Sequence, residues 1–356
     1  MAKDPSRERH PDTGPADHVE GEVSVAPSRK RPDVWHIGPR DVPLPHAASS
    51  ELRESIAASP QPDPTSEPGV PADETALRAL VAAMDAMATE KMQALRDRVG
   101  ATVTPGTIGG VGVFHVTPAT LDPRHDDHLF VYVHGGAYIL NAGEPGAIEA
   151  IVIAHRLGIR TISVDYRMAP DHPLPTPADD VTTVYRRVIG EHPAASVALG
   201  GSSGGGNLST IAVQAAVRDG VDVPGALYLG TPGNDMSEVG DTLHINRGID
   251  RAIPRHEDYV NAVRFHAGGR ELTDPLVSPL YGSFDGFPPT FLVSGTRDLL
   301  LSATVRTHTG IREAGSIADL IVLEGASHGD YGNPLDSPES RFTYSELNAF
   351  LLQHLA

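Results

Sequence analysis

Two patterns of apolar and polar positions, one typical of strands and one typical of helices, alternate along the chain from about residue 110 onward. Short apolar or β-branched runs bounded by turn-forming residues are typical of buried strands. These runs are Val111–Val116, Leu129–Val133, Arg160–Val164, Ser196–Leu199, Ala226–Leu229, Thr290–Val293 and Leu320–Leu323. Stretches with apolar residues at helical spacing lie between or after them, near 146–157, 177–190, 205–219, 256–266, 301–314 and 339–354. This alternation predicts an α/β fold with a mainly parallel central sheet flanked by helices.

The N-terminal part of the chain follows a different pattern. Residues 1–45 are polar and rich in proline, without strand or helix periodicity, so we predict a mostly disordered tail there. Residues 72–98 place apolar side chains, several of them methionines, at helical spacing, which predicts one or two amphipathic helices. We therefore divide the chain into a tail (1–45), an N-terminal helical cap (46–100) and a main α/β domain (101–356).

Composition narrows the classes of function. The chain has 356 residues, of which 40% are hydrophobic and 21% charged, as expected for a globular protein with a sizeable core. Its formal net charge of −18 disfavours nucleic acid and anionic membrane surfaces as partners, because both bind basic surfaces. The absence of cysteine excludes disulfides, thiolate metal sites and a cysteine nucleophile.

The hydropathy pattern also bears on location. No apolar run approaches the roughly 18 residues that a membrane span needs. The N-terminal residues lack the apolar core of a secretory signal, so we expect a cytoplasmic protein. The alternative is a mature secreted form from which a leader has been removed.

A serine lies in a glycine-rich turn between the run Ser196–Leu199 and the helical stretch that follows it. A serine in a G-x-S-x-G turn between strand and helix is the nucleophile elbow of serine hydrolases. Two frames fit, centred on Ser203 and on Ser202, and we prefer Ser203 because two further glycines stand on its helix side. The alternatives are a plain turn or a phosphate loop, but Asn207 stands where a phosphate loop needs lysine.

A second glycine-rich stretch, His134–Tyr138, follows the strand run Leu129–Val133. Glycines after a strand leave backbone N–H groups free to point into a site. We expect the N–H groups of Gly135 and Gly136, with that of Gly204 after the nucleophile, to form an oxyanion hole. A turn that uses glycine only for its positive φ is the alternative.

An acid and a base follow the last two strand runs. Asp298 comes after Thr290–Val293, and His328 comes after Leu320–Leu323. Because ligands bind beyond the carboxyl ends of parallel strands, we expect both side chains to converge on Ser203. His328 would take the proton of Ser203, and Asp298 would orient the imidazole. A lone aspartate or histidine in a loop is usually only solvated, so the joint pattern carries the hypothesis.

The chain resembles the hormone-sensitive-lipase-like esterases, bacterial family IV of the α/β-hydrolase fold, over about residues 105–356. The family's His-Gly-Gly motif matches His134–Tyr138, and its Gly-Asp-Ser-Ala-Gly-Gly elbow matches Gly201–Leu208 with Ser203 as nucleophile. Further matching stretches are Asp165–Pro175, Asp274–Leu280, Gly295–Asp298 and Ser327–Gly329. Ser202 stands where the family usually has aspartate, and Gly204 where it has alanine. These departures put the pH dependence and the rate in doubt, not the reaction type.

The resemblance implies a serine esterase that works through an acyl-enzyme, without a cofactor or metal, on short-to-medium acyl esters as small-molecule substrates. In this family an N-terminal cap narrows the pocket, so we expect Met84, Met87 and Met92 of the predicted cap to line the acyl site. Tyr138, which follows the glycine pair, is a further expected substrate-binding residue. A homodimer is a further expectation, because family members often dimerise. A lactone or amide hydrolase or an acyltransferase would use the same triad. A small-molecule receptor on this fold and an interaction protein acting through the tail are rivals of another class.

Two histidine motifs have simpler interpretations. His125 and His128 flank two aspartates and could bind a metal, but they precede a strand at the end opposite the expected site, which favours a solvated turn. We expect His134 to hydrogen-bond to nearby loop backbone rather than to act in catalysis.

Overall fold

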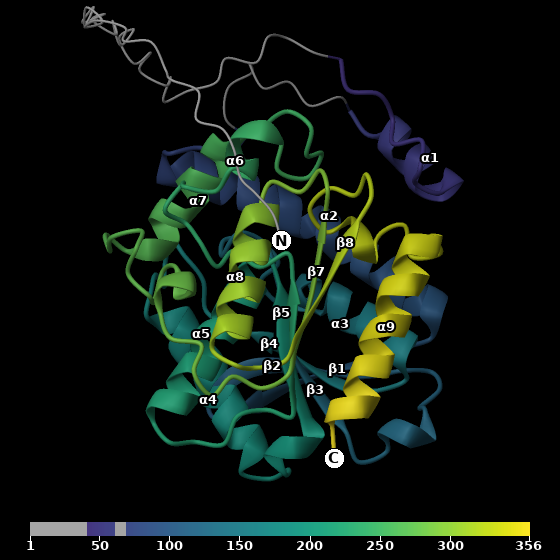
Figure 1. The fold of residues 1–356 in the computed structure, drawn as a ribbon, viewed down its shortest axis with the longest axis vertical. Helices are drawn as coiled ribbons and strands as arrows, with labels where there is room; N and C mark the ends of the chain where they lie inside the picture. Colours follow the sequence, from purple (N-terminus) through teal and green to yellow (C-terminus); the bar gives the residue numbers. More distant parts are fainter. Residues whose placement is uncertain (1–40, 61–68) are drawn as a thin grey trace, which may run out of the picture. The chain divides into compact units, whose positions relative to one another are not determined.

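A single mixed sheet organises the described residues, 41–60 and 69–356, of this computed structural model (Figure 1). Within those ranges eight strands follow the order β1-β2-β4-β3-β5-β6-β7-β8. Neighbours from β4 to β8 pair in parallel, whereas β2 is antiparallel to both β1 and β4. The strands are β1 (Thr102–Ile108), β2 (Val111–Thr117), β3 (Leu129–Val133), β4 (Arg160–Asp165), β5 (Val197–Ser202), β6 (Ala226–Gly230), β7 (Thr290–Gly295) and β8 (Ala318–Leu323). The prediction of a mainly parallel α/β sheet is confirmed.

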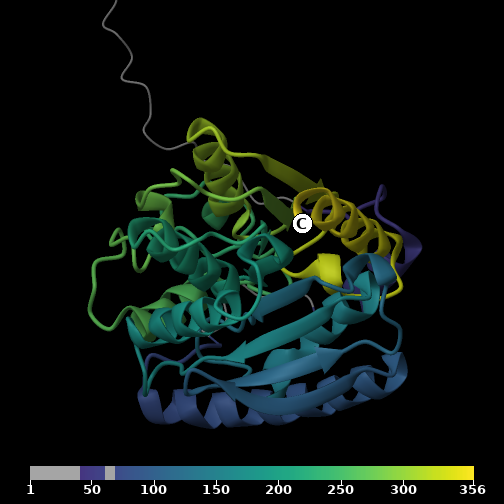
Figure 2. The same cartoon turned by 90° about the horizontal axis from the view of Figure 1, so that it is seen from below.

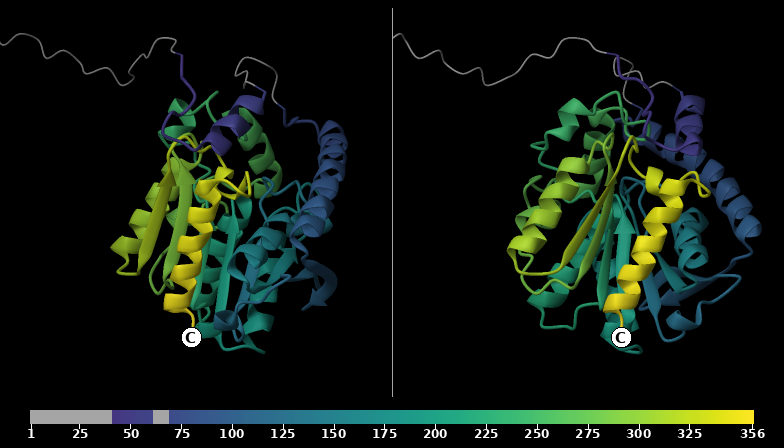
Figure 3. Two further views of the ribbon diagram at one scale, coloured as in Figure 1. Left: turned by 90° about the vertical axis from the view of Figure 1, so that its right-hand side faces the viewer. Right: turned by 45° about the vertical axis from the view of Figure 1, so that its right-hand side comes forward.

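Helices cover both faces of this sheet (Figures 1 and 3). The helices are α1 (Ser50–Ala58), α2 (Glu74–Val99), α3 (Ile148–Leu157), α4 (Thr176–Ile189), α5 (Gly204–Arg218), α6 (Thr242–Ile245), α7 (His256–Ala267), α8 (Leu301–Glu313) and α9 (Pro338–His354). Helices α4, α5 and α8 bury apolar side chains against one face, and α2, α3 and α9 against the other. Figure 2 shows the strands twisting between these two layers.

The N-terminal elements differ in detail from the prediction. The stretch 72–98 forms one helix, α2, which the Asp73 side chain caps by accepting the N–H of Ala76. The helix ends at Val99, and Gly100 follows it in the left-handed conformation, with φ +67°. The sequence pattern did not reveal β1, because Pro105 and Gly106 interrupt it. Proline is tolerated in β1 since this strand lies at the edge of the sheet. The predicted tail, 1–45, falls almost wholly outside the described residues.

The parallel strands bring four loops to one edge of the sheet. Strands β3, β5, β6, β7 and β8 run in the same direction, so the residues that follow each of them meet at the carboxyl edge. The stretches singled out from the sequence follow β3, β5, β7 and β8. Among the helices of the described residues, none combines the length and apolarity needed to cross a membrane.

Candidate active site

Ser203 occupies the sharp turn between β5 and α5. Its backbone has φ 55° and ψ −120°, a conformation that L-residues rarely adopt and that costs free energy unless the surroundings enforce it. The Ser203 N–H donates to the carbonyl of Gly230 at 2.8 Å, and its own carbonyl accepts from Gly233 at 3.0 Å. The turn is thus held from the end of β6, and it presents residue 203 at the start of a helix.

The glycines around this turn are required by packing. A Cβ on either Gly201 or Gly205 would overlap the carbonyl oxygen of Val133 on the neighbouring strand. These two glycines frame Ser203 in the G-x-S-x-G pattern. Ser202 is buried, and its hydroxyl donates a hydrogen bond to Glu149. The strained turn therefore belongs to the Ser203 frame, not to the Ser202 frame.

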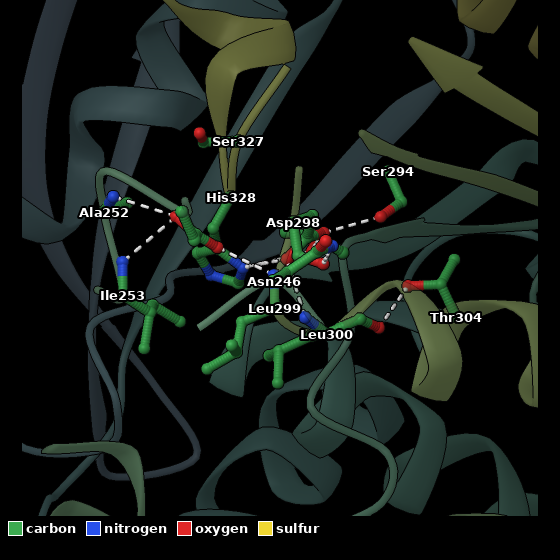
Figure 4. Close-up of polar contacts among 12 residues, drawn as sticks. Asn246, Ala252, Ile253, Ser294, Asp298, Leu299, Leu300, Thr304, Ser327 and His328 are labelled. Atoms are coloured by element: carbon green, nitrogen blue, oxygen red, sulfur yellow. Dashed lines mark hydrogen bonds and ion pairs between the residues drawn. The ribbon is translucent and has the colours of Figure 1, made fainter. Parts of the chain in front are cut away.

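The structure places Asp298 and His328 side by side (Figure 4). Nδ1 of His328 lies 3.0 Å from Oδ1 of Asp298, whose side chain is fully buried. The same carboxylate accepts the N–H of Leu300 at 2.8 Å and the hydroxyls of Ser294 and Thr231. These donors fix the carboxylate, so that it holds the imidazole with Nδ1 protonated and Nε2 free to act as a base.

Thr231 links this pair to the serine turn. Its hydroxyl lies 3.1 Å from His328 Nδ1 and also contacts Asp298, while the preceding residue, Gly230, accepts the N–H of Ser203. Within the described residues no hydrogen bond joins the Ser203 hydroxyl to His328. Catalytic hydrogen bonds often close only when substrate is bound. The end of β6 therefore places the three side chains in one neighbourhood without joining serine to histidine directly.

A second buried carboxylate, Asp250, stands beside the pair and was not found from the sequence. Ligand atoms of Asp250, Asp298 and His328 all lie within 4.8 Å of one another. Asp250 accepts the N–H groups of Ala252 at 2.9 Å and Leu299 at 2.7 Å, so its oxygens are already engaged by backbone. Desolvation and the nearby charge of Asp298 raise the pKa of Asp250 to about 6. No motif marks this residue, because it lies in a long connection between β6 and β7.

The carboxylates around His328 set its charge state. Burial acts to lower the pKa of His328, but Asp298, and then Asp250 and Asp330, outweigh it and hold that pKa above its ordinary value. Burial acts to raise the pKa of Asp298, whereas the charge of His328 and the hydroxyl donors lower it. The pair is therefore suited to stabilise an imidazolium.

The loop after β3 packs directly on the serine turn. A Cβ on Gly135 would lie 2.9 Å from the carbonyl oxygen of Ser202 and 3.2 Å from Ser203 Cβ, so glycine permits this close approach of the two backbones. The Gly135 carbonyl accepts from the Asn141 amide at 3.1 Å and from the His134 ring, whose Nδ1 lies 2.8 Å away. Since the two ends of a peptide group point in opposite directions, these bonds turn the N–H of Gly136 the other way. Its φ of +121° again requires glycine.

Tyr138, at the end of this loop, packs its ring against the start of α5. A Cβ on Gly204 would meet the Tyr138 ring at 2.9 Å, and the ring stacks on His266 with centroids 3.7 Å apart. The hydroxyls of Tyr138 and Tyr259 and both ring nitrogens of His266 are buried and have no hydrogen-bond partner among the described residues. Burial lowers the pKa of His266 to about 3, so this ring is neutral.

The methionines of α2 are placed apart from these groups. Met84 is 43% exposed and Met87 is 60% exposed, whereas Met92 is fully buried in the core. A cavity of about 440 Å³ lies where α2 faces the loop after β4, and Val81, Ile139 and Met168 are among the residues that line it. None of the three methionines of α2 lines this cavity, and neither does Ser203, Asp298 or His328. A role of Met84 and Met87 in binding substrate stays a prediction.

The other histidine motifs have structural partners. His125 is fully buried, with Nε2 2.8 Å from the Asn348 side-chain oxygen and Nδ1 2.9 Å from Nδ1 of His128. The pair is buried more deeply than the solvated turn expected from the sequence, and both nitrogens of His125 and Nδ1 of His128 take part in hydrogen bonds.

Comparison with known proteins identifies the family. The sequence profile of the alpha/beta hydrolase fold family matches residues 130–331. The chain belongs to this family. A solved crystal structure of an esterase named E25 is 50% identical, with a TM-score of 0.89 and coverage of 91% of this chain and 100% of that one. An esterase from the bacterial hormone-sensitive lipase family is 26% identical, with a TM-score of 0.75 and coverage of 87% and 100%. The resemblance to hormone-sensitive-lipase-like esterases is confirmed.

Curated relatives of this α/β hydrolase match over shorter stretches. An acetyl-hydrolase of Streptomyces hygroscopicus is 28% identical over 200 residues, which cover 56% of this chain and 66% of that protein. The chain spans between 44% and 66% of the length of the first curated relatives that it matches.

Proposed function

We propose that this α/β hydrolase is a serine esterase that cleaves carboxylic esters of short-to-medium acyl chains. The observation that carries the proposal is the buried Asp298–His328 pair beside the strained turn at Ser203. The names of the solved relatives, which are esterases, support the same reaction class.

The proposed reaction proceeds in two steps. Ser203 Oγ attacks the ester carbonyl carbon while its proton passes to Nε2 of His328, and the tetrahedral intermediate collapses as the alcohol leaves with that proton. A water molecule, deprotonated by His328, then attacks the acyl carbon, and the acid leaves as the bond to Ser203 Oγ breaks and His328 returns the proton to that oxygen. The N–H groups of Gly135, Gly136 and Gly204 would bind the oxyanion in both steps.

The role of the N-terminal residues belongs to the same proposal. We infer that residues 46–100 act as a cap on the catalytic domain, 101–356. Support comes from α2, where Leu77 packs with Ile139 of the loop after β3 and where Asp85 accepts the N–H of Asn141 at 2.7 Å. A homodimeric state and a cytoplasmic location stay predictions.

A substrate panel tests the function. We expect p-nitrophenyl esters from acetate to octanoate to be hydrolysed faster than lactones and anilides of matched size. An organophosphonate should label Ser203, and Ser203→Ala should remove both labelling and turnover, lowering kcat roughly 10⁴-fold or more. Preferred turnover of lactones or anilides would reassign the substrate class. Labelling of another residue, or full activity in Ser203→Ala, would overturn the mechanism.

A further inference from the structure

A buried carboxylate, Glu149, lies directly beneath the serine elbow, on the α3 side of the sheet. Ser202 Oγ donates to Glu149 Oε1 at 2.6 Å, and the Tyr132 hydroxyl donates to the other carboxylate oxygen. Burial raises the pKa of Glu149, and the hydrogen bonds from Ser202 and Tyr132 oppose that rise. Hydroxyl donors on both of its oxygens make this residue the acceptor at the end of a hydrogen-bond network.

The sheet leaves room for this network at two glycines. Gly200 pairs with Tyr132 on one side and with Tyr228 on the other, so a row across β3, β5 and β6 has no side chain at its centre. Ser202 pairs with Gly230 two residues further along. A Cβ on Gly230 would lie 2.6 Å from Ser202 Oγ and 2.7 Å from the Tyr228 hydroxyl. The absence of side chains at Gly200 and Gly230 therefore leaves the space in which these polar groups contact one another.

The network also reaches the loop that carries His328. The hydroxyl of Tyr331, three residues after His328, donates to Ser202 Oγ at 2.7 Å. Ser202 has one hydroxyl proton and gives it to Glu149, so Tyr331 must be the donor at this contact. These two bonds run in one direction: Tyr331 donates to Ser202, and Ser202 donates to Glu149.

Asp330, which lies between His328 and Tyr331, connects this loop to its surroundings. The Asp330 carboxylate accepts the N–H of Ser327 at 2.8 Å and forms a buried ion pair with Arg251. A displacement of Tyr331 would therefore move His328 with it. At the other end, Ser202 immediately precedes Ser203, so the same bond acts on the nucleophile.

We propose that the Tyr331–Ser202–Glu149 network is a positioning device that aligns His328 with Ser203. It connects the loop that carries His328 to the turn that carries Ser203 through Glu149, a buried carboxylate of α3. Related esterases usually carry their carboxylate on the elbow itself, as an aspartate at the position of Ser202. The side chains of Ser202 and Glu149 do not touch the reacting atoms; they act through the residues beside them. This inference rests on the proposed esterase function.

The test compares two Tyr→Phe variants that each remove one buried hydroxyl. Tyr331→Phe breaks the network, whereas Tyr344→Phe removes a buried hydroxyl of the same core that has no hydrogen-bond partner among the described residues. An organophosphonate titration counts competent Ser203 sites, so that kcat is expressed per site. We expect Tyr331→Phe to lower kcat per site about ten- to a hundredfold with little change in KM, because small misplacements of catalytic groups are costly. Tyr344→Phe should match the wild type.

A double variant tests the connection. Ser202→Ala and the Ser202→Ala/Tyr331→Phe double variant should lower kcat per site to a similar extent, because both break the same bond. Multiplication of the two single effects would overturn the network, as would a Tyr331→Phe enzyme whose kcat per site equals that of Tyr344→Phe. A wild-type protein that neither hydrolyses esters nor labels at Ser203 would instead overturn the esterase function.

Discussion

Nδ1 of His328 lies 3.0 Å from Oδ1 of Asp298, a carboxylate that no solvent reaches. A buried charge is tolerated only when hydrogen bonds or an opposite charge compensate its lost hydration. Here a backbone N–H, two hydroxyls and the imidazole supply that compensation. The same contacts orient the ring, so the stability of the carboxylate and the orientation of the base depend on one set of bonds.

Replacing Asp298 by asparagine should therefore damage catalysis far more than the change in size suggests. The asparagine side chain has only one oxygen that can accept hydrogen bonds, and its NH2 group would donate to Nδ1 of His328. The imidazole would then carry its proton on Nε2, so His328 could not accept the proton of Ser203. We expect kcat/KM for a p-nitrophenyl ester to fall roughly 10⁴-fold, as in other triads. A loss below about tenfold, measured on protein shown to be folded by circular dichroism, would contradict the role given to Asp298.

The pH dependence of activity should report the carboxylates around His328. The imidazole acts as a base only when neutral, and Asp298, Asp250 and Asp330 hold its pKa above the ordinary value of about 6.5. Activity should therefore fall with decreasing pH from a point above about 6.5. Removing the charge of Asp250 should lower the pKa of His328, so Asp250→Asn should move the acidic limb of kcat/KM to lower pH.

A matched change of charge elsewhere provides the control. Glu191 is exposed in the turn after α4, before β5 begins. Glu191→Gln removes the same charge as Asp250→Asn and should leave the pH profile unchanged. An acidic limb that stays in place in Asp250→Asn, or that moves equally in both variants, would show that Asp250 does not act on His328.

The proposed oxyanion hole in the loop after β3 should depend on a contact from α2. Asp85 accepts the N–H of Asn141, and the Asn141 side chain donates to the carbonyl of Gly135. Asp85→Ala should lower kcat about tenfold and leave KM nearly unchanged, since an oxyanion hole stabilises charge that develops only in the transition state. Asp97→Ala, on the same helix at a side chain 71% exposed, should have no effect. A rise in KM alone would indicate that α2 contacts the substrate instead.

The sequence predicted those parts of the fold and of the candidate site that follow from local patterns and from the geometry of parallel strands. Strand runs such as Leu129–Val133 are apolar throughout because helices cover both faces, so their pattern needs no tertiary knowledge. Ser203, Asp298 and His328 could be named because parallel strands bring their following loops to one edge. The sequence did not predict β1, because a proline usually argues against a strand. Pro105 is tolerated there since β1 lies at the edge of the sheet.

The supporting carboxylates show the limit of such reasoning. Glu149 follows Ile148 at the start of an apolar helix, and only its pairing with Ser202, 53 positions away, gives it a role. An acidic residue in the first turn of a largely apolar helix was the one available signal, and it does not identify the partner. Asp250 offers no comparable signal, because its neighbours come from the backbone of Ala252 and Leu299.

His266 provides a last prediction, in which a histidine near the serine turn acts as an apolar ring. It stacks on Tyr138, its nitrogens have no partners among the described residues, and burial lowers its pKa to about 3. A buried polar group without a partner costs about 1–3 kcal/mol, and phenylalanine has nearly the same shape. His266→Phe should therefore raise Tm while the acidic limb of the pH profile stays where it is. His266→Ala, which removes the stacked ring and leaves a cavity, should lower Tm. If His266→Phe also lowered Tm, the ring nitrogens would have a partner, and a shifted acidic limb would mean that His266 titrates with the base.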